Sequence, residues 1–298
     1  MMRVILAAAA ISLALAAPAS AADDPLLRPI ASGYAARWLG AEAPIRIHGN
    51  SYIVGFSGLN VGLIRTTAGL ILIDGALPQA VPAIEANIRR LGLRVKDIKL
   101  ILSTEPHYDH AGGLAALARD SGATVAASAP AAEVLRRGRS GPDDPQATQL
   151  ASFPAVTRLR VVRDGEVIRL GDVAVTARAT PGHTAGSMSW TWSSCERGAC
   201  LAMVFGSSLN PVSSEGYRFS DPDHRGVVDA FRDSFGVMRA LPCDVLLTSH
   251  PDQSGGDVRR ARFERQPEPN PFVDRGACRA YADRFARVLD ERLASERR

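Results

Sequence analysis

The sequence predicts an α/β protein with one domain made of two similar halves. Apolar segments of strand length alternate with amphipathic segments of helix length, and the second half repeats the rhythm of the first. No Pro- or Ser-rich linker separates the halves. Of the 298 residues, 46% are hydrophobic and 22% are charged, which is enough apolar mass for a large core.

The first half begins with β patterns and then alternates between strands and helices. Residues 69–74 contain a Leu-Ile-Leu-Ile run that is apolar on both faces, as in a strand covered on both sides. Residues 78–91 carry apolar side chains at helical spacing, with Pro78 near the first turn. We expect strands at 52–56, 61–66, 69–74, 98–102 and 124–127, and helices at 78–91, 113–119 and 129–137.

The second half begins after a polar segment, 138–149, which contains Gly and Pro. This composition predicts an irregular surface loop, which could lie near a site. Alternating strand patterns follow it, and one of them ends at Thr180-Pro181-Gly182-His183. We expect strands at 158–162, 166–170, 173–179, 187–193, 201–204 and 245–247, and helices at 225–240 and from 274 to the last residue.

The first residues have the pattern of a secretory signal peptide. Arg3 precedes an apolar stretch, and Ala19-Ser20-Ala21 forms a small-residue cleavage site. The apolar stretch is shorter than the roughly 20 residues that a membrane span needs. We therefore expect residues 1–21 to be removed, residues 22–298 to form a single periplasmic domain without a membrane anchor, and the chain to be a monomer. The net charge of +4 is too small to indicate a nucleic-acid partner.

Four cysteines in an exported chain allow three disulfide pairings. Cys195 and Cys200 flank a short segment that is typical of a hairpin turn, so a local disulfide is favoured there. Cys243 and Cys278 would then form the second pair. Cysteine ligation of a metal is less favoured, because neither pair has the C-x-x-C spacing of a closed zinc site.

A cluster of potential metal ligands follows the predicted strand 98–102. Glu105, His107, Asp109 and His110 lie within six positions, where the end of a strand and the following turn gather side chains together. Two further predicted strands are followed by histidines, His183 and His250. The chain has six histidines in all. We expect His107, His110, His183 and His250 to take part in a metal site and His224 to have a structural role, whereas His48 precedes the first predicted strand and carries no motif.

On these residues the sequence resembles the metallo-β-lactamase superfamily, whose H-x-H-x-D-H motif is matched by Glu105-x-His107-x-Asp109-His110. The likeness extends from about residue 45 to 278 and is greatest to the third subclass, B3, of true metallo-β-lactamases. It implies a four-layer αβ/βα sandwich with two mixed β-sheets flanked by helices. Other matching segments are Leu72-Ile73-Asp74-Gly75, Gly112-Gly113, Thr180 to Ser187, Ser208-Leu209-Asn210 and Ser249-His250.

The resemblance implies two zinc ions, with one site formed by Glu105, His107 and His183 and the other by Asp109, His110 and His250. Three protein ligands per ion would leave an open coordination position, as catalytic zinc requires. Glu105 departs from the family pattern, which has histidine there. A carboxylate can bind zinc, but it would reduce the positive charge of the centre. The alternative is that Glu105 orients a neighbouring histidine and is not itself a ligand.

The resemblance further implies a β-lactam amide hydrolase. A hydroxide held between the ions would attack the ring carbonyl, with Asp109 as both ligand and orienting group. Ser208 and Asn210 are candidates to bind the substrate carboxylate, although such residues are also common in turns.

Three other functions remain open. The chain could be an exported dinuclear hydrolase of another lactone, ester or amide, but residues 204–210 lack the acidic residue that bridges the metals in superfamily thioesterases and lactonases. It could also be an iron redox protein, or a metal-binding homologue without catalysis.

Overall fold

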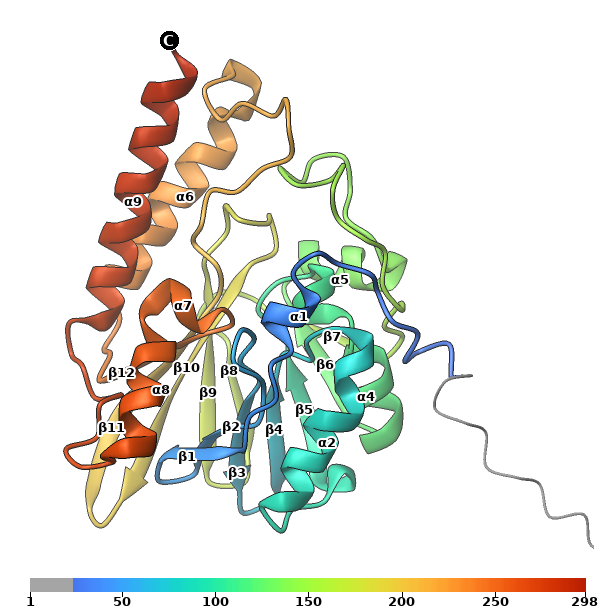
Figure 1. Ribbon diagram of the computed structural model, residues 1–298, viewed down its shortest axis with the longest axis vertical. Helices are drawn as coiled ribbons and strands as arrows, with labels where there is room; N and C mark the ends of the chain where they lie inside the picture. Colours follow the sequence, from blue (N-terminus) through green and yellow to red (C-terminus); the bar gives the residue numbers. More distant parts are fainter. Residues whose placement is uncertain (1–23) are drawn as a thin grey trace, which may run out of the picture.

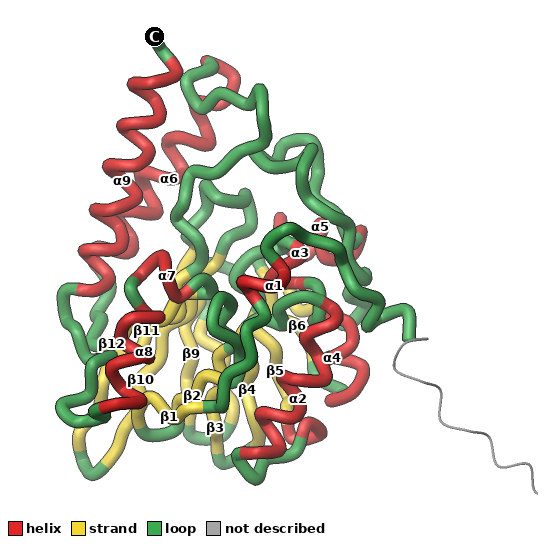
Figure 2. The backbone as a smooth tube through the Cα atoms, in the orientation of Figure 1, coloured by secondary structure: helices red, strands yellow, loops and turns green. Residues whose placement is uncertain are grey.

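The computed structural model describes residues 24–298, so the expected signal peptide and the expected first residue of the mature chain lie outside the described part. Two β-sheets face each other in the middle of the molecule, and helices cover their outer faces (Figure 1). The same layers are visible as yellow strands between red helices in Figure 2. The predicted four-layer αβ/βα sandwich with two mixed sheets is confirmed.

The first sheet has seven strands in sequence order, antiparallel from β1 to β4 and parallel from β4 to β7. One of these strands, β1, is not predicted by the sequence pattern, and it contains His48. The strands are β1 Ile45–His48, β2 Ser51–Ile53, β3 Gly62–Thr66, β4 Gly69–Ile73, β5 Ile98–Leu102, β6 Thr124–Ala127 and β7 Leu159–Val161.

The second sheet has five strands in the order β12-β11-β10-β9-β8, with only the β11–β12 pair parallel. The strands are β8 Val167–Leu170, β9 Val173–Ala179, β10 Met188–Glu196, β11 Ala199–Gly206 and β12 Val245–Thr248. The β10–β11 hairpin is longer than expected, because the strand pairing extends toward the turn and includes Cys195 and Cys200. The favoured disulfides are confirmed: Cys195 is bonded to Cys200, and Cys243 to Cys278.

All five predicted helices are present, and the expected helix 78–91 divides into a 3-10 turn and an α-helix. The α-helices are α1 Ala35–Trp38, α2 Val81–Arg90, α3 Tyr108–Ala111, α4 Leu114–Ser121, α5 Ala129–Arg137, α6 Arg225–Ala240, α7 Pro251–Ser254, α8 Gly256–Arg265 and α9 Ala277–Glu296; the 3-10 turns are η2 Pro78–Ala80, η3 Val95–Asp97 and η4 Pro222–His224. The sequence patterns did not predict α1, α3, α7 or α8. No helix among residues 24–298 is long and apolar enough to cross a bilayer.

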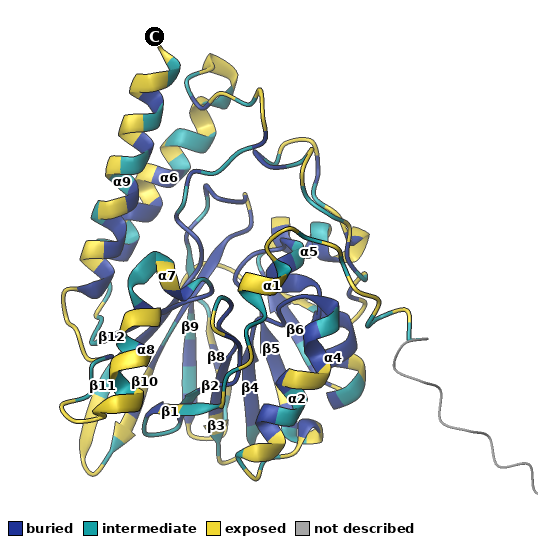
Figure 3. Ribbon diagram, in the orientation of Figure 1, coloured by how far each residue is buried: buried dark blue, intermediate teal, exposed yellow. Residues whose placement is uncertain are grey.

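Three apolar clusters fill the spaces between the four layers. The central one joins the inner faces of the two sheets, for example Ile73 and Leu102 with Trp190 and Phe205. A second lies between the first sheet and helices α2, α4 and α5, and a third lies between the second sheet and helices α6 and α9. The central strands are mostly buried, whereas β7, β8, the tip of the β10–β11 hairpin and the outward faces of the helices are partly or fully exposed (Figure 3). This packing holds the strand ends that carry the predicted ligands in fixed positions.

Candidate metal centre

All six predicted ligands lie at the ends of core strands or on the turns that follow them. Glu105 and His107 are in the loop after β5, and Asp109 and His110 are on the short helix α3. His183 and His250 follow β9 and β12, which belong to the second sheet. The two sheets therefore bring residues that are far apart in sequence to one edge of the sandwich.

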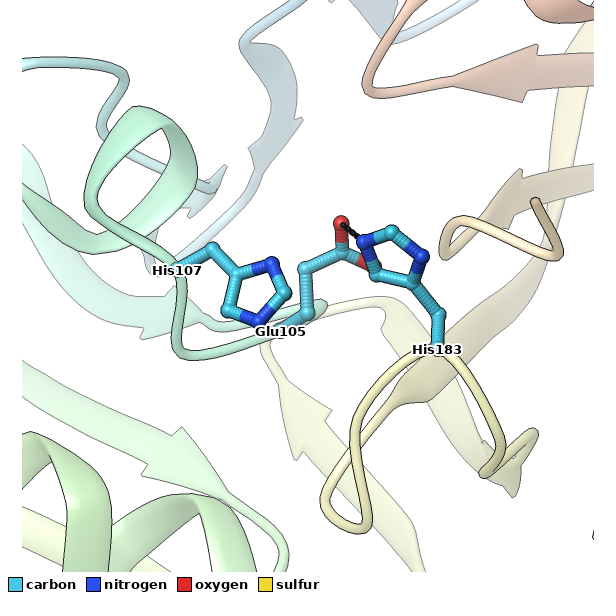
Figure 4. Close-up of side chains that lie close together, drawn as sticks. All are labelled: Glu105, His107 and His183. Carbon is cyan, nitrogen blue, oxygen red and sulfur yellow. Dashed lines mark ion pairs between the residues drawn. The ribbon is translucent and has the colours of Figure 1, made fainter. Parts of the chain in front are cut away.

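The structure gathers the six residues into two groups of three. Glu105, His107 and His183 form one group, and Asp109, His110 and His250 form the other. Within each group the potential ligand atoms lie within 4.8 Å of one another, and only His250 is more than slightly exposed. We name these the first and second ligand groups. Figure 4 shows the first group, with the Glu105 carboxylate directed toward the His183 ring.

Glu105 is completely buried, and its two oxygens have different surroundings. Oε2 accepts a hydrogen bond of 2.8 Å from the backbone N–H of Ser208. Oε1 has no hydrogen-bond partner among the described residues, but it lies 3.1 Å from His110 Nε2 and 3.6 Å from His183 Nε2. A buried carboxylate oxygen without a donor is costly unless a cation neutralises it. The donor set therefore fits a divalent metal ion.

The charges around Glu105 support the same interpretation. Burial alone would raise the pKa of Glu105, but the His110 and His183 imidazoles hold it far below the usual range of a carboxyl group. Burial would lower the pKa of His110, yet Asp109 and Glu105 raise it well above the usual value. Without metal, a protonated His110 therefore supplies the positive charge that these two carboxylates need.

The rings of two histidines are oriented by hydrogen bonds on the nitrogen that faces away from the group. His183 Nδ1 lies 2.7 Å from the carbonyl oxygen of Asn210, which can only accept, so Nδ1 carries the proton and Nε2 keeps its lone pair. His107 Nε2 lies 2.9 Å from a carboxylate oxygen of Asp144. Such outer partners fix the tautomer of a metal-binding histidine.

Asp74, directly after β4, joins the ends of three strands beneath the ligands. Its carboxylate accepts hydrogen bonds from Thr104 N at 2.8 Å, Thr104 Oγ1 at 2.7 Å and Ser249 Oγ at 2.8 Å. It also lies 3.7 Å from His110 Nδ1. Its φ of 64° is left-handed, a conformation that Asp tolerates better than most residues. Burial raises the pKa of Asp74 to about 6, against the opposing effects of His110 and Thr104.

A cavity of about 420 Å³ opens onto both ligand groups. Asn210, one of the two predicted substrate-binding residues, lines this cavity, whereas Ser208 is buried outside its lining, next to Glu105. Trp38 of α1 covers one side, with its ring centroid 5.7 Å from that of His250. Further lining residues include Tyr34, Arg37, Tyr108, Gln149, Val212 and Gln253.

Sequence reasoning missed two polar residues of the loop 138–149 that contact the first ligand group. Asp144 contacts His107, and the side-chain amide nitrogen of Gln146 lies 3.3 Å from His183 Nε2. The expected irregular loop is confirmed, and it does lie beside the site. The only sequence signal was its position between two elements of the predicted core, which does not indicate where a side chain reaches.

The remaining two histidines lie outside both ligand groups. His224 Nδ1 is 2.6 Å from the carbonyl oxygen of Arg218, and its ring stacks on Tyr217. His48 lies 4.0 Å from Glu196 at the far end of the β10–β11 hairpin. The contacts of His224 agree with the structural role that we expected for it.

The metallo-β-lactamase superfamily model matches residues 54–250, and the chain belongs to this superfamily. Its solved relatives include a B3 metallo-β-lactamase with an active-site glutamic acid, which is 54% identical over 93% of this chain and 99% of that chain, with a TM-score of 0.84. The Rm3 metallo-β-lactamase is 44% identical over 90% and 100% of the two chains, with a TM-score of 0.87. MEM-A1, a subclass B3 enzyme from a soil metagenome library, is 43% identical over 87% and 98%, with a TM-score of 0.84. The predicted resemblance to subclass B3, with a glutamate variant, is confirmed.

Proposed function

We propose that this protein is a zinc-dependent β-lactamase that opens the β-lactam ring by hydrolysing its amide bond. The observation that carries the proposal is the pair of three-residue ligand groups at one edge of the sandwich, with Glu105 in the first group. A relative with an active-site glutamic acid and 54% identity is itself described as a B3 metallo-β-lactamase, which supports the same activity here.

The two ligand groups would each hold one zinc ion. When bound, zinc supplies Lewis acidity, which acidifies a water molecule for attack and polarises the amide carbonyl. Nitrogen ligands from four imidazoles and oxygen ligands from Glu105 and Asp109 suit zinc, and three ligands per group leave room for substrate and water. The hydrogen bond to the Asn210 carbonyl leaves the Nε2 lone pair of His183 available for the ion once the Gln146 amide, 3.3 Å away, moves aside.

Asp109 would combine two tasks in catalysis. Its Oδ2 lies 3.3 Å from His110 Nε2 and 3.2 Å from His250 Nε2, so this oxygen belongs to the second ligand group. The other carboxylate oxygen would accept a hydrogen bond from the attacking water and orient it toward the carbonyl carbon. In the metal-free protein, burial would raise the pKa of Asp109, but His110 and His250 hold it well below its usual value, so it stays an acceptor.

Asn210 is the better placed of the two predicted carboxylate binders, because it lines the cavity and Ser208 does not. The Asn210 side-chain amide would donate to the substrate carboxylate while its backbone carbonyl holds His183. Ser208 would act from behind the site, where its backbone N–H fixes Glu105. The substrate would thus meet a polar wall that is part of the ligand scaffold.

We also propose that residues 22–298 form one monomeric domain that functions in the periplasm after removal of residues 1–21. The signal-peptide pattern supports export. Two disulfides support it independently, since structural disulfides persist in oxidising compartments.

The test is hydrolysis of a penicillin, a cephalosporin and a carbapenem by the purified mature protein, with a lactone and a thioester in the same panel. Turnover of at least one β-lactam, lost with a chelator and restored by zinc, is the expected result. Turnover only of the lactone or thioester, or activity that depends on iron, would overturn the proposal. No turnover of any substrate at full zinc occupancy would indicate metal binding without catalysis.

A further inference from the structure

Asp144 holds His107 from the loop 138–149, which lies outside the superfamily motif. The distance from Asp144 Oδ2 to His107 Nε2 is 2.9 Å, and the two side chains are only 8% and 3% exposed. The contact is therefore shielded from water, unlike the exposed ion pairs elsewhere on the surface. In such a setting a charge-assisted hydrogen bond is short and strong.

The Asp144 carboxylate is itself held in place by its own loop. Its Oδ1 accepts a 2.8 Å hydrogen bond from the backbone N–H of Gln146, and its backbone N–H donates to the carbonyl of Gly141 at 3.2 Å. The next residue, Pro145, accepts a hydrogen bond of 2.8 Å from the backbone N–H of Ser214. Because the carboxylate is anchored on both sides, the imidazole ring must adopt the orientation that the carboxylate sets.

A carboxylate can only accept, so the contact has a chemical consequence for the ring. The proton of a neutral His107 belongs on Nε2, and the lone pair then belongs on Nδ1. His183 has the opposite arrangement, with its proton on Nδ1 and its lone pair on Nε2. The two histidines of the first ligand group are thus set in opposite tautomers by two different outer partners.

We propose that Asp144 is a positioning residue that accepts the Nε2 proton of His107 and so commits Nδ1 as the metal-binding atom of the first ligand group. This inference rests on the proposed metal centre. It assigns the loop 138–149 a second task besides forming a wall of the cavity, since the loop fastens one ligand of the first group. The second ligand group has no contact of this kind with the loop among the described residues.

The test compares Asp144→Ala and Asp144→Asn with a matched control, Asp143→Ala. Asp143 is the exposed neighbour in the same loop, so its substitution removes an equal charge without touching His107. Zinc affinity is measured by titration against a chromophoric chelator, and the His107 tautomer by nitrogen-15 NMR of the imidazole in the zinc-loaded protein. Circular dichroism confirms that each variant is folded.

We expect Asp144→Ala to weaken zinc binding at one of the two sites by about 10- to 100-fold, as loss of an outer partner of a metal-binding histidine does. The zinc affinity of the other site should not change, and Asp143→Ala should bind zinc at both sites with the affinity of the unchanged protein. Asp144→Asn keeps an accepting oxygen, so it should retain the tautomer and lose less affinity. If Asp144→Ala does not fold, the tautomer in the unchanged protein and the affinity of Asp144→Asn decide the matter.

The inference is overturned if His107 carries its proton on Nδ1 in the unchanged protein, or if Asp144→Ala is folded and binds two zinc ions with unchanged affinity. Neither readout uses a β-lactam. A protein that shows the expected tautomer and affinities but hydrolyses no β-lactam would therefore contradict the proposed function and leave this inference intact.

Discussion

Glu105 makes a contact that a histidine at the same position could not make. Its Oε2 satisfies the buried N–H of Ser208, while its Oε1 faces His110 and His183. An imidazole has one nitrogen for the metal and one for an outer partner, and the neutral ring could not accept from Ser208 while its other nitrogen also bound metal. The carboxylate therefore links the metal site to the backbone of the segment that lines the cavity.

Replacing Glu105 should separate these two tasks. Glu105→His is expected to raise zinc affinity at the first group, because imidazole suits zinc better than a carboxylate does. The same change removes the buried carboxylate that faces His110 Nε2 at 3.1 Å, so the metal-free variant should be about 1–3 kcal/mol less stable. Zinc titration and urea denaturation of the metal-free proteins measure the two effects. Identical zinc titrations for the variant and the unchanged protein would show that Glu105 is not a ligand.

Asp74 connects elements of both sheets, since it follows β4 and binds Thr104 after β5 and Ser249 after β12. Its removal would leave the Thr104 N–H and at least one of the two hydroxyl donors unsatisfied in a region that excludes water. We expect Asp74→Ala to lower the free energy of unfolding by about 3 kcal/mol or more and to misplace His110. Asp74→Asn, which also tolerates a left-handed backbone, should cost less. Chemical denaturation measures the free energy of unfolding of both variants and of the unchanged protein. An Asp74→Ala variant as stable as the unchanged protein would contradict this role.

The two disulfides should contribute unequally to stability. Cys243 and Cys278 are 35 residues apart and tie α9 to the segment before β12, whereas Cys195 and Cys200 are 5 residues apart within one hairpin. The loop-entropy relation gives about 4 kcal/mol for the long loop and about 2 kcal/mol for the short one. Replacing each pair by serines and measuring urea unfolding tests the order. A larger loss from the hairpin pair would contradict it.

Elements with a strong periodic pattern were predictable from sequence, and the others depended on contacts that no local pattern shows. Strand β5 and helix α6 were predicted with their observed ends, because their apolar spacing is regular. Strand β1 has four residues with two polar side chains, and α8 is mostly charged, so neither pattern stood out.

The same distinction holds for the site. The gathering of the six candidate ligands into two groups was predictable, because each residue follows a strand within a segment that matches the family. Asp144 was not, since its partner His107 lies 37 positions earlier and a loop of Gly, Pro and Asp looks like any surface turn.

The whole molecule should respond to metal in a manner that depends on pH. In the metal-free protein, burial lowers the pKa of His110. The carboxylates of Asp109 and Glu105 more than offset this effect, so the pKa is raised well above its usual value. A raised folded-state pKa gives a stabilisation that is complete below the unfolded value of about 6.5 and is lost as pH rises through the folded value. Zinc needs the neutral ring, so it competes with this proton at low pH.

The difference in melting temperature between zinc-loaded and metal-free protein should therefore grow from pH 6 to pH 9. Calorimetry of both forms at several pH values measures it, with Asp143→Ala as a variant that should behave like the unchanged protein. A difference that shrinks as pH rises would show that protons and zinc do not compete for the ligand groups.

We propose that two zinc ions, one in each ligand group, make this chain a β-lactam hydrolase. The most direct measurement is the rate of cephalosporin hydrolysis during addition of zinc to the metal-free protein, with zinc per chain counted on the same samples by elemental analysis. We predict that turnover rises with bound zinc and reaches its maximum at two ions per chain. Two bound zinc ions per chain with no hydrolysis of a cephalosporin, a penicillin or a carbapenem would contradict the claim.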